Sequence, residues 1–304
     1  MVDQYAFLRP NRSSHEYKIP FCTLTPLFFL LLLSLGCGTT KAVTKQQAVA
    51  PNIGLSHRKV TIPTPNAKGS PTEVSPPEIM DYANIDVLKE FMYPDSTDRS
   101  IVFYTYPGSS TDNSKYSRSE LREQMIPGNN DVNWEFADGG YMKVTMSVPD
   151  VTKEDSGKGH RVIIAQIHGK LTKAQQALIG QKDTNAPPVP KIYYQYGKVE
   201  VRTKVFPIRK PTEEEILTTK NWVDDEKYIF IQDVGTGKFT LEVFVSDGRL
   251  EVKLNGFEEA VYKNKSIQVW SVFDNYFKTR NYLTTRDKGA FAKKIYALEV
   301  SYPD

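Results

Sequence analysis

The fold is set by a hairpin sequence at residues 239–254, FTLEVFVSDGRLEVKL. Apolar and polar residues alternate on both sides of Asp247-Gly248, which is the period of a strand with one buried face. An Asp-Gly pair between two such runs is a strong signal for a tight β-turn. These residues therefore predict two antiparallel strands that bury one face in a core.

The same signals recur through the rest of the chain. Residues 141–148 and 198–205 alternate in the same way, and the β-branched run at 162–165 is typical of a fully buried strand. Helical patterns are brief. A short amphipathic helix with Ile85, Leu88 and Phe91 on one face is expected to open the domain, and residues 172–178 and 212–217 are the other candidates. Many strands with few short helices predict an all-β fold, a jelly-roll sandwich of two antiparallel sheets.

The N-terminal segment has the plan of an export signal. A polar stretch with basic residues precedes an apolar run at 21–35, which is too short for a comfortable membrane span. Gly36-Cys37 then resembles the cleavage box of bacterial lipoproteins, although Ser34 stands where that box usually has a branched aliphatic residue. We expect residues 1–37 to be a signal segment and a lipidated Cys37 to anchor the exported protein to the outer membrane or cell surface. An uncleaved anchor and a plainly periplasmic or secreted protein are the alternatives.

A tether and one domain are predicted after the signal. Residues 38–77 are rich in Thr, Lys, Gln, Pro and Ser, which is typical of a flexible linker. Residues 78–304 are long enough for a single domain with a sizeable core. The only cysteines, Cys22 and Cys37, lie in the signal segment, so the domain has no disulfide and no thiolate metal site.

Three stretches place polar side chains at alternate positions of expected strands, and therefore on one sheet face each. Taken singly, such positions usually mean a solvated sheet face. Together they predict a concave groove that binds a polyanion, because polar groups on apolar strands need partners. The residues are Arg118, Glu120 and Arg122, then Gln166 and His168, then Tyr276, Lys278, Arg280 and Tyr282.

Residues 169–191 interrupt the strand pattern directly after Gln166 and His168. Long loops are uncommon in compact domains and often cover binding sites. We expect this segment to form a wall or lid of the groove; the alternative is an inert surface insertion.

These motifs resemble those of a known enzyme family. RSELR at 118–122, QIH at 166–168 and YFK followed by Tyr282 are similar, in the same order, to the signatures of the alginate lyases of polysaccharide lyase family 7. The resemblance runs from about residue 78 to the C-terminus. It implies a jelly-roll lyase that cleaves alginate by β-elimination, without a cofactor, and leaves an unsaturated uronate end. The family commonly has Ala-Gly after the lysine, where this chain has Thr279-Arg280, so a subsite differs in shape.

The chemistry of elimination explains the residue types. The C5 proton of a uronate is weakly acidic while the neighbouring carboxylate is ionised, so that charge must first be neutralised. Arg118 and the amide of Gln166 suit this task, and Arg122 helps them or holds another carboxylate. Glu120 is expected to orient the arginines, because adjacent positive charge keeps it ionised and weakly basic.

His168 is expected to accept the proton near neutral pH, and Tyr282 to act as the acid or as a partly activated base. The family habit associates Ile167 with acceptance of guluronate, and a groove closed by residues 169–191 predicts action from chain ends. By resemblance, the catalytic residues are Arg118, Gln166, His168 and Tyr282, and the substrate-binding residues are Glu120, Arg122, Lys278, Arg280 and Tyr276.

No metal or other cofactor is predicted. Beyond the linker the only histidines are His160 and His168, no His-Glu-x-x-His spacing occurs, and we expect His160 to be solvated. The net charge of +3 is too small for a nucleic-acid binder. The expected partner is alginate or a related acidic polysaccharide, bound by a monomer that meets a membrane only through Cys37.

Two other functions fit a jelly roll. A glycoside hydrolase needs two carboxylates across the scissile bond, but its common Glu-x-Asp-x-x-Glu strand motif is absent. A noncatalytic carbohydrate-binding module would have no need for His168 and Tyr282 together. Elimination creates a chromophore that absorbs near 235 nm, roughly where a conjugated uronate absorbs, whereas hydrolysis and binding do not.

Overall fold

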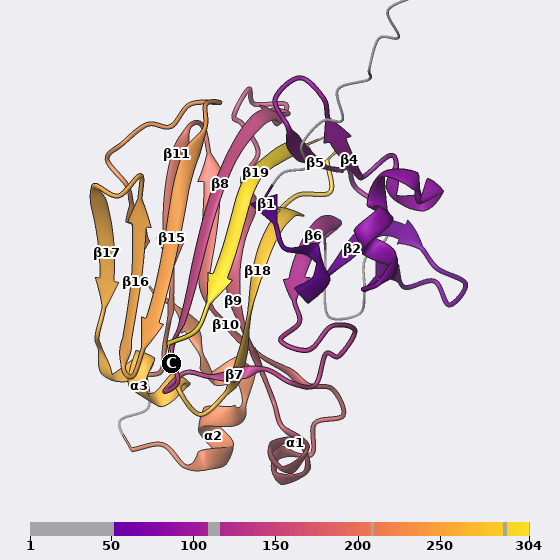
Figure 1. Cartoon of the computed structure of the whole chain (residues 1–304). Helices are drawn as coiled ribbons and strands as arrows, with labels where there is room; N and C mark the ends of the chain where they lie inside the picture. The colour runs from indigo at the N-terminus through magenta and orange to yellow at the C-terminus, as the bar shows by residue number, and fades with distance from the viewer. Residues whose placement is uncertain (1–51, 109–115, 208–209, 226, 288–290, 304) are drawn as a thin grey trace, which may run out of the picture. The chain divides into compact units, whose positions relative to one another are not determined.

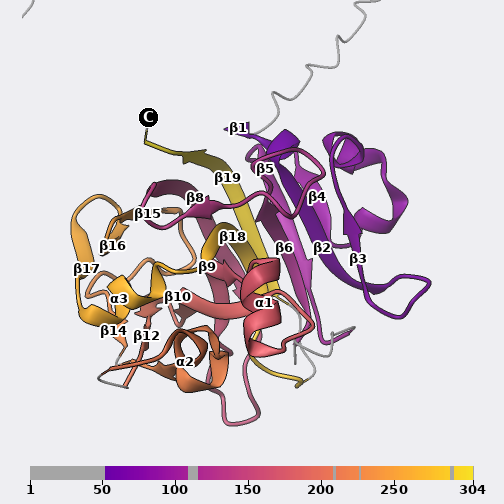
Figure 2. The same cartoon turned by 90° about the horizontal axis from the view of Figure 1, so that it is seen from below.

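The protein forms a sandwich of two large sheets, as the sequence predicted (Figure 1 and Figure 2). The computed structural model describes residues 52–108, 116–207, 210–225, 227–287 and 291–303. Apolar side chains from the facing sides of both sheets form one buried core. The α-helices are short and lie at one end of the strands.

The first sheet packs against the second sheet, which carries the predicted groove residues. All its strand pairs are antiparallel except β1 with β19. In spatial order its strands are β17 (Glu258–Tyr262), β16 (Arg249–Leu254), β15 (Phe239–Ser246), β8 (Gly140–Val151), β19 (Phe291–Ser301), β5 (Ser100–Thr105) and β4 (Met92–Asp95), with β1 (Asn52–Ile53) beside β19.

The second sheet carries the predicted motifs in its central strands. Its spatial order is β14 (Tyr228–Ile229), β11 (Lys198–Arg202), β10 (Asn185–Gln195), β9 (Val162–Lys170), β18 (Asp274–Leu283), β6 (Arg118–Glu123), β2 (Arg58–Pro65) and β3 (Pro71–Val74), with β7 (Trp134–Glu135) beside β18. A separate pair is formed by β12 (Lys204–Val205) and β13 (Val223–Asp224).

The helices confirm the two short helical predictions. Both α1 (Lys173–Ile179) and α2 (Glu213–Leu217) begin with a capping box, in which a threonine side chain and the residue three positions later exchange hydrogen bonds. The remaining helical segments are α3 (Lys265–Trp270) and the 3₁₀ turns η1 (Leu55–His57), η2 (Glu78–Asn84), η3 (Asp86–Leu88) and η4 (Thr219–Asn221).

The hairpin at 239–254 forms as its sequence predicts. Strands β15 and β16 pair in register up to Ser246 and Arg249, and Gly248 takes the left-handed conformation that the turn requires. The alternate residues Leu241, Val243 and Val252 are buried in the core. One face of the hairpin is therefore the inner face of the first sheet.

The predicted linker at 38–77 is wrong from Asn52 onward. Residues 58–65 and 71–74 form β2 and β3, and β2 pairs with β6 next to the groove. The prolines that suggested a tether are tolerated because β3 is an edge strand and Pro65 and Pro71 lie where its pairing with β2 ends. Val60 and Ile62, both fully buried, were the overlooked signal of a strand.

The segment at 169–191 is more regular than predicted. It contains the end of β9, helix α1 and the start of β10, so only its middle part connects elements. Its prolines interrupt the pairing of β10 with β9, which shifts register between Asn185, Pro188 and Lys191. Proline lacks the amide donor that a regular ladder needs, which is why the sequence looked like a loop.

The predicted signal segment and Cys37 lie outside the described residues. Within the part of the chain that the structure describes, no helix is long and apolar enough to cross a membrane.

Candidate active site

Strand register brings the three predicted motifs together on one face of the second sheet. On β18, Tyr282 lies opposite Arg118 and Arg280 opposite Glu120 of β6. On the other side of β18, Tyr276 lies opposite His168 of β9. Directly opposed residues of antiparallel strands share a face, so polar side chains from three strands meet there.

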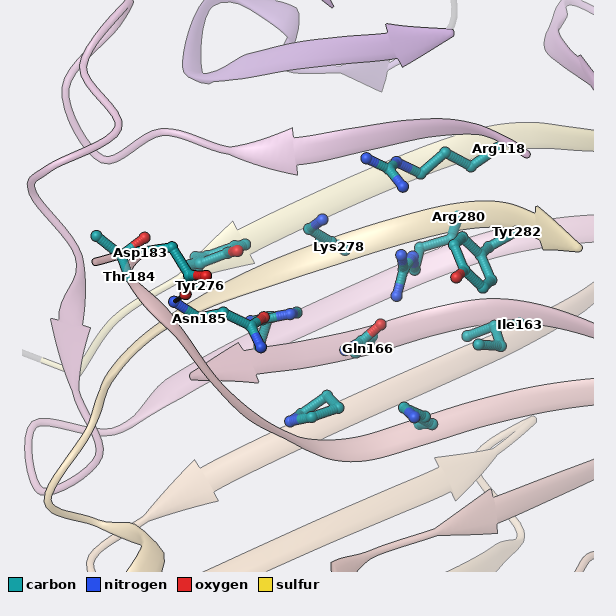
Figure 3. A pocket seen from close by; sticks show the side chains of 13 residues that line it. Arg118, Ile163, Gln166, Asp183, Thr184, Asn185, Tyr276, Lys278, Arg280 and Tyr282 are labelled. Carbon is teal, nitrogen blue, oxygen red and sulfur yellow. Dashed lines mark hydrogen bonds between the residues drawn. The ribbon is translucent and has the colours of Figure 1, made fainter. Parts of the chain in front are cut away.

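These side chains line a pocket of about 400 Å³ (Figure 3). Seven of the nine predicted residues line it, and Glu120 and Arg122 line an adjoining hollow of about 240 Å³ that shares several residues with it. The seven are Arg118, Gln166, His168, Tyr276, Lys278, Arg280 and Tyr282.

The segment at 169–191 supplies one wall of this pocket, as predicted. Asp183, Thr184 and Asn185 lie together along one side in Figure 3. Pro188 and Lys191 of β10 also line the pocket. The sequence analysis did not single out these residues, because the run of prolines concealed a strand whose alternation would have placed Lys191 on the groove face.

Ile163 is a pocket residue that periodicity assigns to the core. The pairing of β18 with β9 shifts between Thr279 and Tyr282, so Tyr282 lies opposite Ile163. Such an irregularity changes which side chains a strand presents to each face. No local feature of the apolar sequence predicts this register shift.

Glu120 is the electrostatic centre of the site. It is 1% exposed, and its Oε1 lies 2.7 Å from Lys278 Nζ and 3.1 Å from Arg118 Nε. Its Oε2 accepts a hydrogen bond from Arg280 Nε. Burial alone would raise the pKa of Glu120, but the three cations outweigh it and hold that pKa well below its usual range. Glu120 is therefore ionised and fixes the positions of three cations.

The surroundings of Lys278 disfavour its charged form. Burial, together with the charges of Arg280 and Arg118, lowers the pKa of Lys278 to about 7, although Glu120 acts in the opposite direction. The Lys278 ammonium therefore gives up its proton more readily than an exposed lysine does. A bound carboxylate would favour the charged form.

His168 is held in one tautomer. Its Nδ1 lies 2.7 Å from the carbonyl oxygen of Gly169. Nδ1 therefore carries the hydrogen and donates a hydrogen bond to that oxygen, and Nε2 keeps its lone pair. The ring stacks on Tyr276 with a centroid distance of 5.4 Å and an interplanar angle of 11°. Burial and the charge of Lys278 lower the pKa of His168 to about 3. The imidazole is therefore neutral at neutral pH and can accept a proton at Nε2.

Gly169 permits this arrangement. A Cβ at that position would lie 2.9 Å from the carbonyl oxygen of Pro187, closer than side chains tolerate. The glycine therefore lets β10 approach β9 beside His168.

Arg122 has most of its donors engaged by the protein. It donates to Asn130 Oδ1 at 2.8 Å, to Asn133 Oδ1 at 2.9 Å and to the carbonyl oxygen of Asn130 at 3.0 Å. Its guanidinium also lies 4.0 Å from the ring centroid of Tyr276. Of the two roles expected for Arg122, support of its neighbours fits this geometry better than binding a second carboxylate.

Tyr282 and Gln166 face the middle of the pocket. The guanidinium of Arg280 lies 4.4 Å from the ring centroid of Tyr282, and Tyr116 contacts the same ring edge-on. Gln166 is buried, and its Oε1 has no hydrogen-bond partner among the described residues. Because a buried amide oxygen without a partner costs free energy, Gln166 is suited to contact a ligand.

His160 is not solvated, contrary to expectation. It is 1% exposed, with Nδ1 3.1 Å from Thr152 Oγ1 and Nε2 3.2 Å from Asp287 Oδ2. It therefore joins two connecting segments outside the pocket. Among the described residues, no three His, Cys, Asp or Glu side chains gather in a way that could hold a metal ion.

Comparison with known proteins agrees with these motifs. A family model described as alginate lyase matches residues 53–302. The crystal structure of alginate lyase A1-II', a member of polysaccharide lyase family 7, has a TM-score of 0.65 and 28% identity over 83% of this chain and 97% of that one. An alginate lyase from Pseudomonas aeruginosa has a TM-score of 0.59 and 23% identity over 82% and 99% of the two chains, a likeness of fold.

Two further structures of A1-II' variants contain ligands. One is a complex with a product abbreviated GGG, at 28% identity, a TM-score of 0.65 and coverage of 83% and 97%. The other is a complex with a substrate abbreviated GGMG, also at 28% identity, with a TM-score of 0.63 and coverage of 83% and 94%. No curated protein matches the sequence significantly.

Proposed function

This chain belongs to the alginate lyase family, and we propose that it cleaves guluronate-containing alginate by β-elimination in the pocket over β6, β18, β9 and β10. The observation that carries the proposal is the meeting of Arg118, Gln166, His168 and Tyr282 in one pocket. These four groups are the catalytic set that elimination requires.

The first step is neutralisation of the uronate carboxylate. Arg118 is positioned by Glu120 and lies at one side of the pocket, while the amide of Gln166 lies at its floor. Donors that are already oriented stabilise the charge that develops on the carboxylate when the C5 proton leaves. Glu120 keeps Arg118, Lys278 and Arg280 in place and takes no proton itself.

The second step is proton transfer. His168 Nε2 is the acceptor, because the hydrogen bond from Nδ1 to Gly169 leaves only that lone pair free for the substrate. A bound polyanion offsets the charge of Lys278 and so raises the pKa of His168 toward the working range. Tyr282 donates to the departing glycosidic oxygen, and Arg280 over its ring stabilises the phenolate that results.

Guluronate and mannuronate present the C5 hydrogen on opposite sides relative to the leaving oxygen. The division of labour between His168 and Tyr282 therefore differs between them. Acceptance of guluronate is supported by the G-containing ligands of the A1-II' complexes. Ile167 acts on this preference only indirectly, because it is buried beneath the groove.

The proposal also includes cleavage from the ends of the alginate chain. Residues 183–185 form a wall on one side of the pocket. In the adjoining hollow, Glu73 and Asp131 are paired with Lys59 and Lys170, so these cations have little charge left to bind a further uronate. Early products that are monomers or dimers support end action, whereas long oligomers would refute it.

The test of the activity is ultraviolet absorbance. Purified protein is mixed with polyguluronate, polymannuronate or native alginate, and absorbance is followed near 235 nm, roughly where a conjugated uronate absorbs. A rise that is fastest on guluronate-containing polymer supports the proposal. Binding of polymer without any rise indicates a noncatalytic module and overturns it.

Export with a lipid at Cys37 and a monomeric state complete the proposal. The lipoprotein-like box at residues 33–37 supports the first, and the groove formed within a single chain supports the second. A Cys37→Ala variant that stays in the membrane fraction would contradict the lipid anchor. A dimer measured by light scattering would contradict the monomeric state.

A further inference from the structure

A single cross-strand row of the groove carries a charged or amide side chain on each of six adjacent strands. Each member lies directly opposite the next member on the neighbouring strand, so all of them share the groove face. Neighbouring strands lie about 4.8 Å apart, which is close to the length of one sugar unit. The row runs Lys59 (β2), Arg122 (β6), Lys278 (β18), Gln166 (β9), Lys191 (β10) and Arg202 (β11).

In the adjoining hollow of about 240 Å³ the cations are already engaged by the protein. Lys59 Nζ lies 2.6 Å from Glu73 Oε2, and Lys170 Nζ lies 2.8 Å from Asp131 Oδ1. Arg122 is engaged by asparagines of the segment before β7. A polyanion gains little from Lys59 and Lys170, whose charges are compensated, or from Arg122, whose donors are occupied.

Lys191 differs from all of these. It lines the 400 Å³ pocket and is half-buried, yet its side-chain ammonium makes no hydrogen bond or ion pair with any described residue. Burial and the nearby charges of Lys204, Arg280 and Arg161 lower the pKa of Lys191 to about 8, with Asp224 acting in the opposite direction. A carboxylate from a ligand would supply the missing partner.

The row continues from Lys191 to Arg202 on β11. Arg202 Nε lies 2.8 Å from Glu200 Oε1, and Arg161 Nη1 lies 3.1 Å from the same oxygen. Both guanidinium groups lie over the ring of Tyr193, at 5.9 Å and 4.3 Å from its centroid. One carboxylate thus serves two arginines, and this part of the face keeps net positive charge.

We propose that Lys191 and Arg202 bind the carboxylates of successive uronate units next to the one held by Arg118 and Gln166, so that the substrate extends over β10 and β11. This inference rests on the proposed function, because it assigns subsites to the same groove. Lys191 holds the adjacent unit and Arg202 the unit beyond it. The polymer thus leaves the pocket on the side where the Lys191 ammonium has no protein partner and where two arginines share one carboxylate.

The test compares Lys191→Met with Lys59→Met, which removes a paired cation from the opposite end of the same row. KM is measured on guluronate oligomers of increasing length by absorbance near 235 nm, roughly the uronate maximum. We expect Lys191→Met to raise KM at least about tenfold, the loss of one hydrogen bond to a charged group. Lys59→Met raises it less than about twofold, and Lys191→Arg restores most of the affinity because it keeps the charge.

Arg202→Gln distinguishes a subsite from a structural role. Its effect on KM grows with oligomer length, because only longer oligomers reach β11. Equal effects at all lengths, a wild-type KM in Lys191→Met, or matching losses in Lys191→Met and Lys59→Met would overturn the inference.

Failure of the proposed function is distinguishable from failure of this inference. If the unaltered protein gives no absorbance change on any uronate polymer, the lyase proposal fails. Calorimetric binding of oligomers to a Tyr282→Phe protein, with and without Lys191→Met, measures the Lys191 contact without turnover. A Kd that does not change with Lys191→Met in this pair contradicts the inference alone.

Discussion

Replacing Glu120 by glutamine tests the electrostatic core of the site. The carboxylate is 1% exposed and contacts Lys278, Arg118 and Arg280. Glutamine keeps the shape but leaves three cations facing one another without a counter-charge. Removing one partner of a buried ion pair costs about 3–5 kcal/mol. In a domain of this size each kcal/mol lowers Tm by about 2–4 °C, so we expect a fall on the order of 6–20 °C.

The same change should impair catalysis. Arg118 loses a contact that positions it, and Lys278 loses the neighbouring carboxylate that raises its pKa, so its amine is less charged at neutral pH. We expect kcat/KM on alginate to fall at least about hundredfold, comparable with loss of an oriented charge-stabilising donor.

The matched control is Glu251→Gln. Glu251 is also buried and contacts two cations, Arg249 and Lys253, but it lies on the first sheet, away from the groove, and its partners are more exposed. We expect a loss of about 1 kcal/mol or less and unchanged kinetics. Thermal unfolding by circular dichroism and absorbance assays are run on both variants. Equal Tm and activity losses in the two, or a wild-type Glu120→Gln, would refute the role of the cluster.

Other expected outcomes concern the reacting groups and pH. His168→Ala and Tyr282→Phe should each lower kcat at least about a hundredfold, the scale of general acid–base groups, and wild-type-like rates would remove them from the mechanism. Arg118→Lys should lower kcat/KM about tenfold or more, because a point ammonium lacks the fork that grips a carboxylate; unaltered kinetics would exclude a forked contact. The folded-state pKa of His168 lies at about 3, below its ordinary 6.5, so the unfolded chain binds more protons between these values and stability falls as pH drops through this window. In urea unfolding, His168→Gln should flatten that fall; an unchanged slope would contradict the assigned shift.

Much of the site was predictable because strand alternation is a local property. The parity of Arg118, Glu120 and Arg122 on one strand, and of Lys278 and Tyr282 on another, follows from side-chain geometry alone. The family resemblance of these motifs then ordered them along one groove. The pairing that joins β6, β18 and β9 connects residues more than a hundred positions apart, and no local pattern encodes it.

The errors have physical causes as well. Residues 58–65 looked like a tether because prolines and polar residues dominate them, yet burial of Val60 and Ile62 against the core outweighs that local preference. Residues 185–191 looked like a loop for the same reason, which hid Lys191. His160 looked solvated, but packing encloses it between Thr152 and Asp287.

The amino-acid order by itself determined that the chain is a two-sheet β-sandwich with guanidinium, amide, imidazole and phenol groups on alternate strand positions. Only the tertiary structure decided which of these groups meet, that Glu120 holds three cations, and that His168 presents Nε2 to the pocket. The reason is that alternation depends on the geometry of a single strand, whereas charge, tautomer and burial depend on neighbours that arrive from distant parts of the chain.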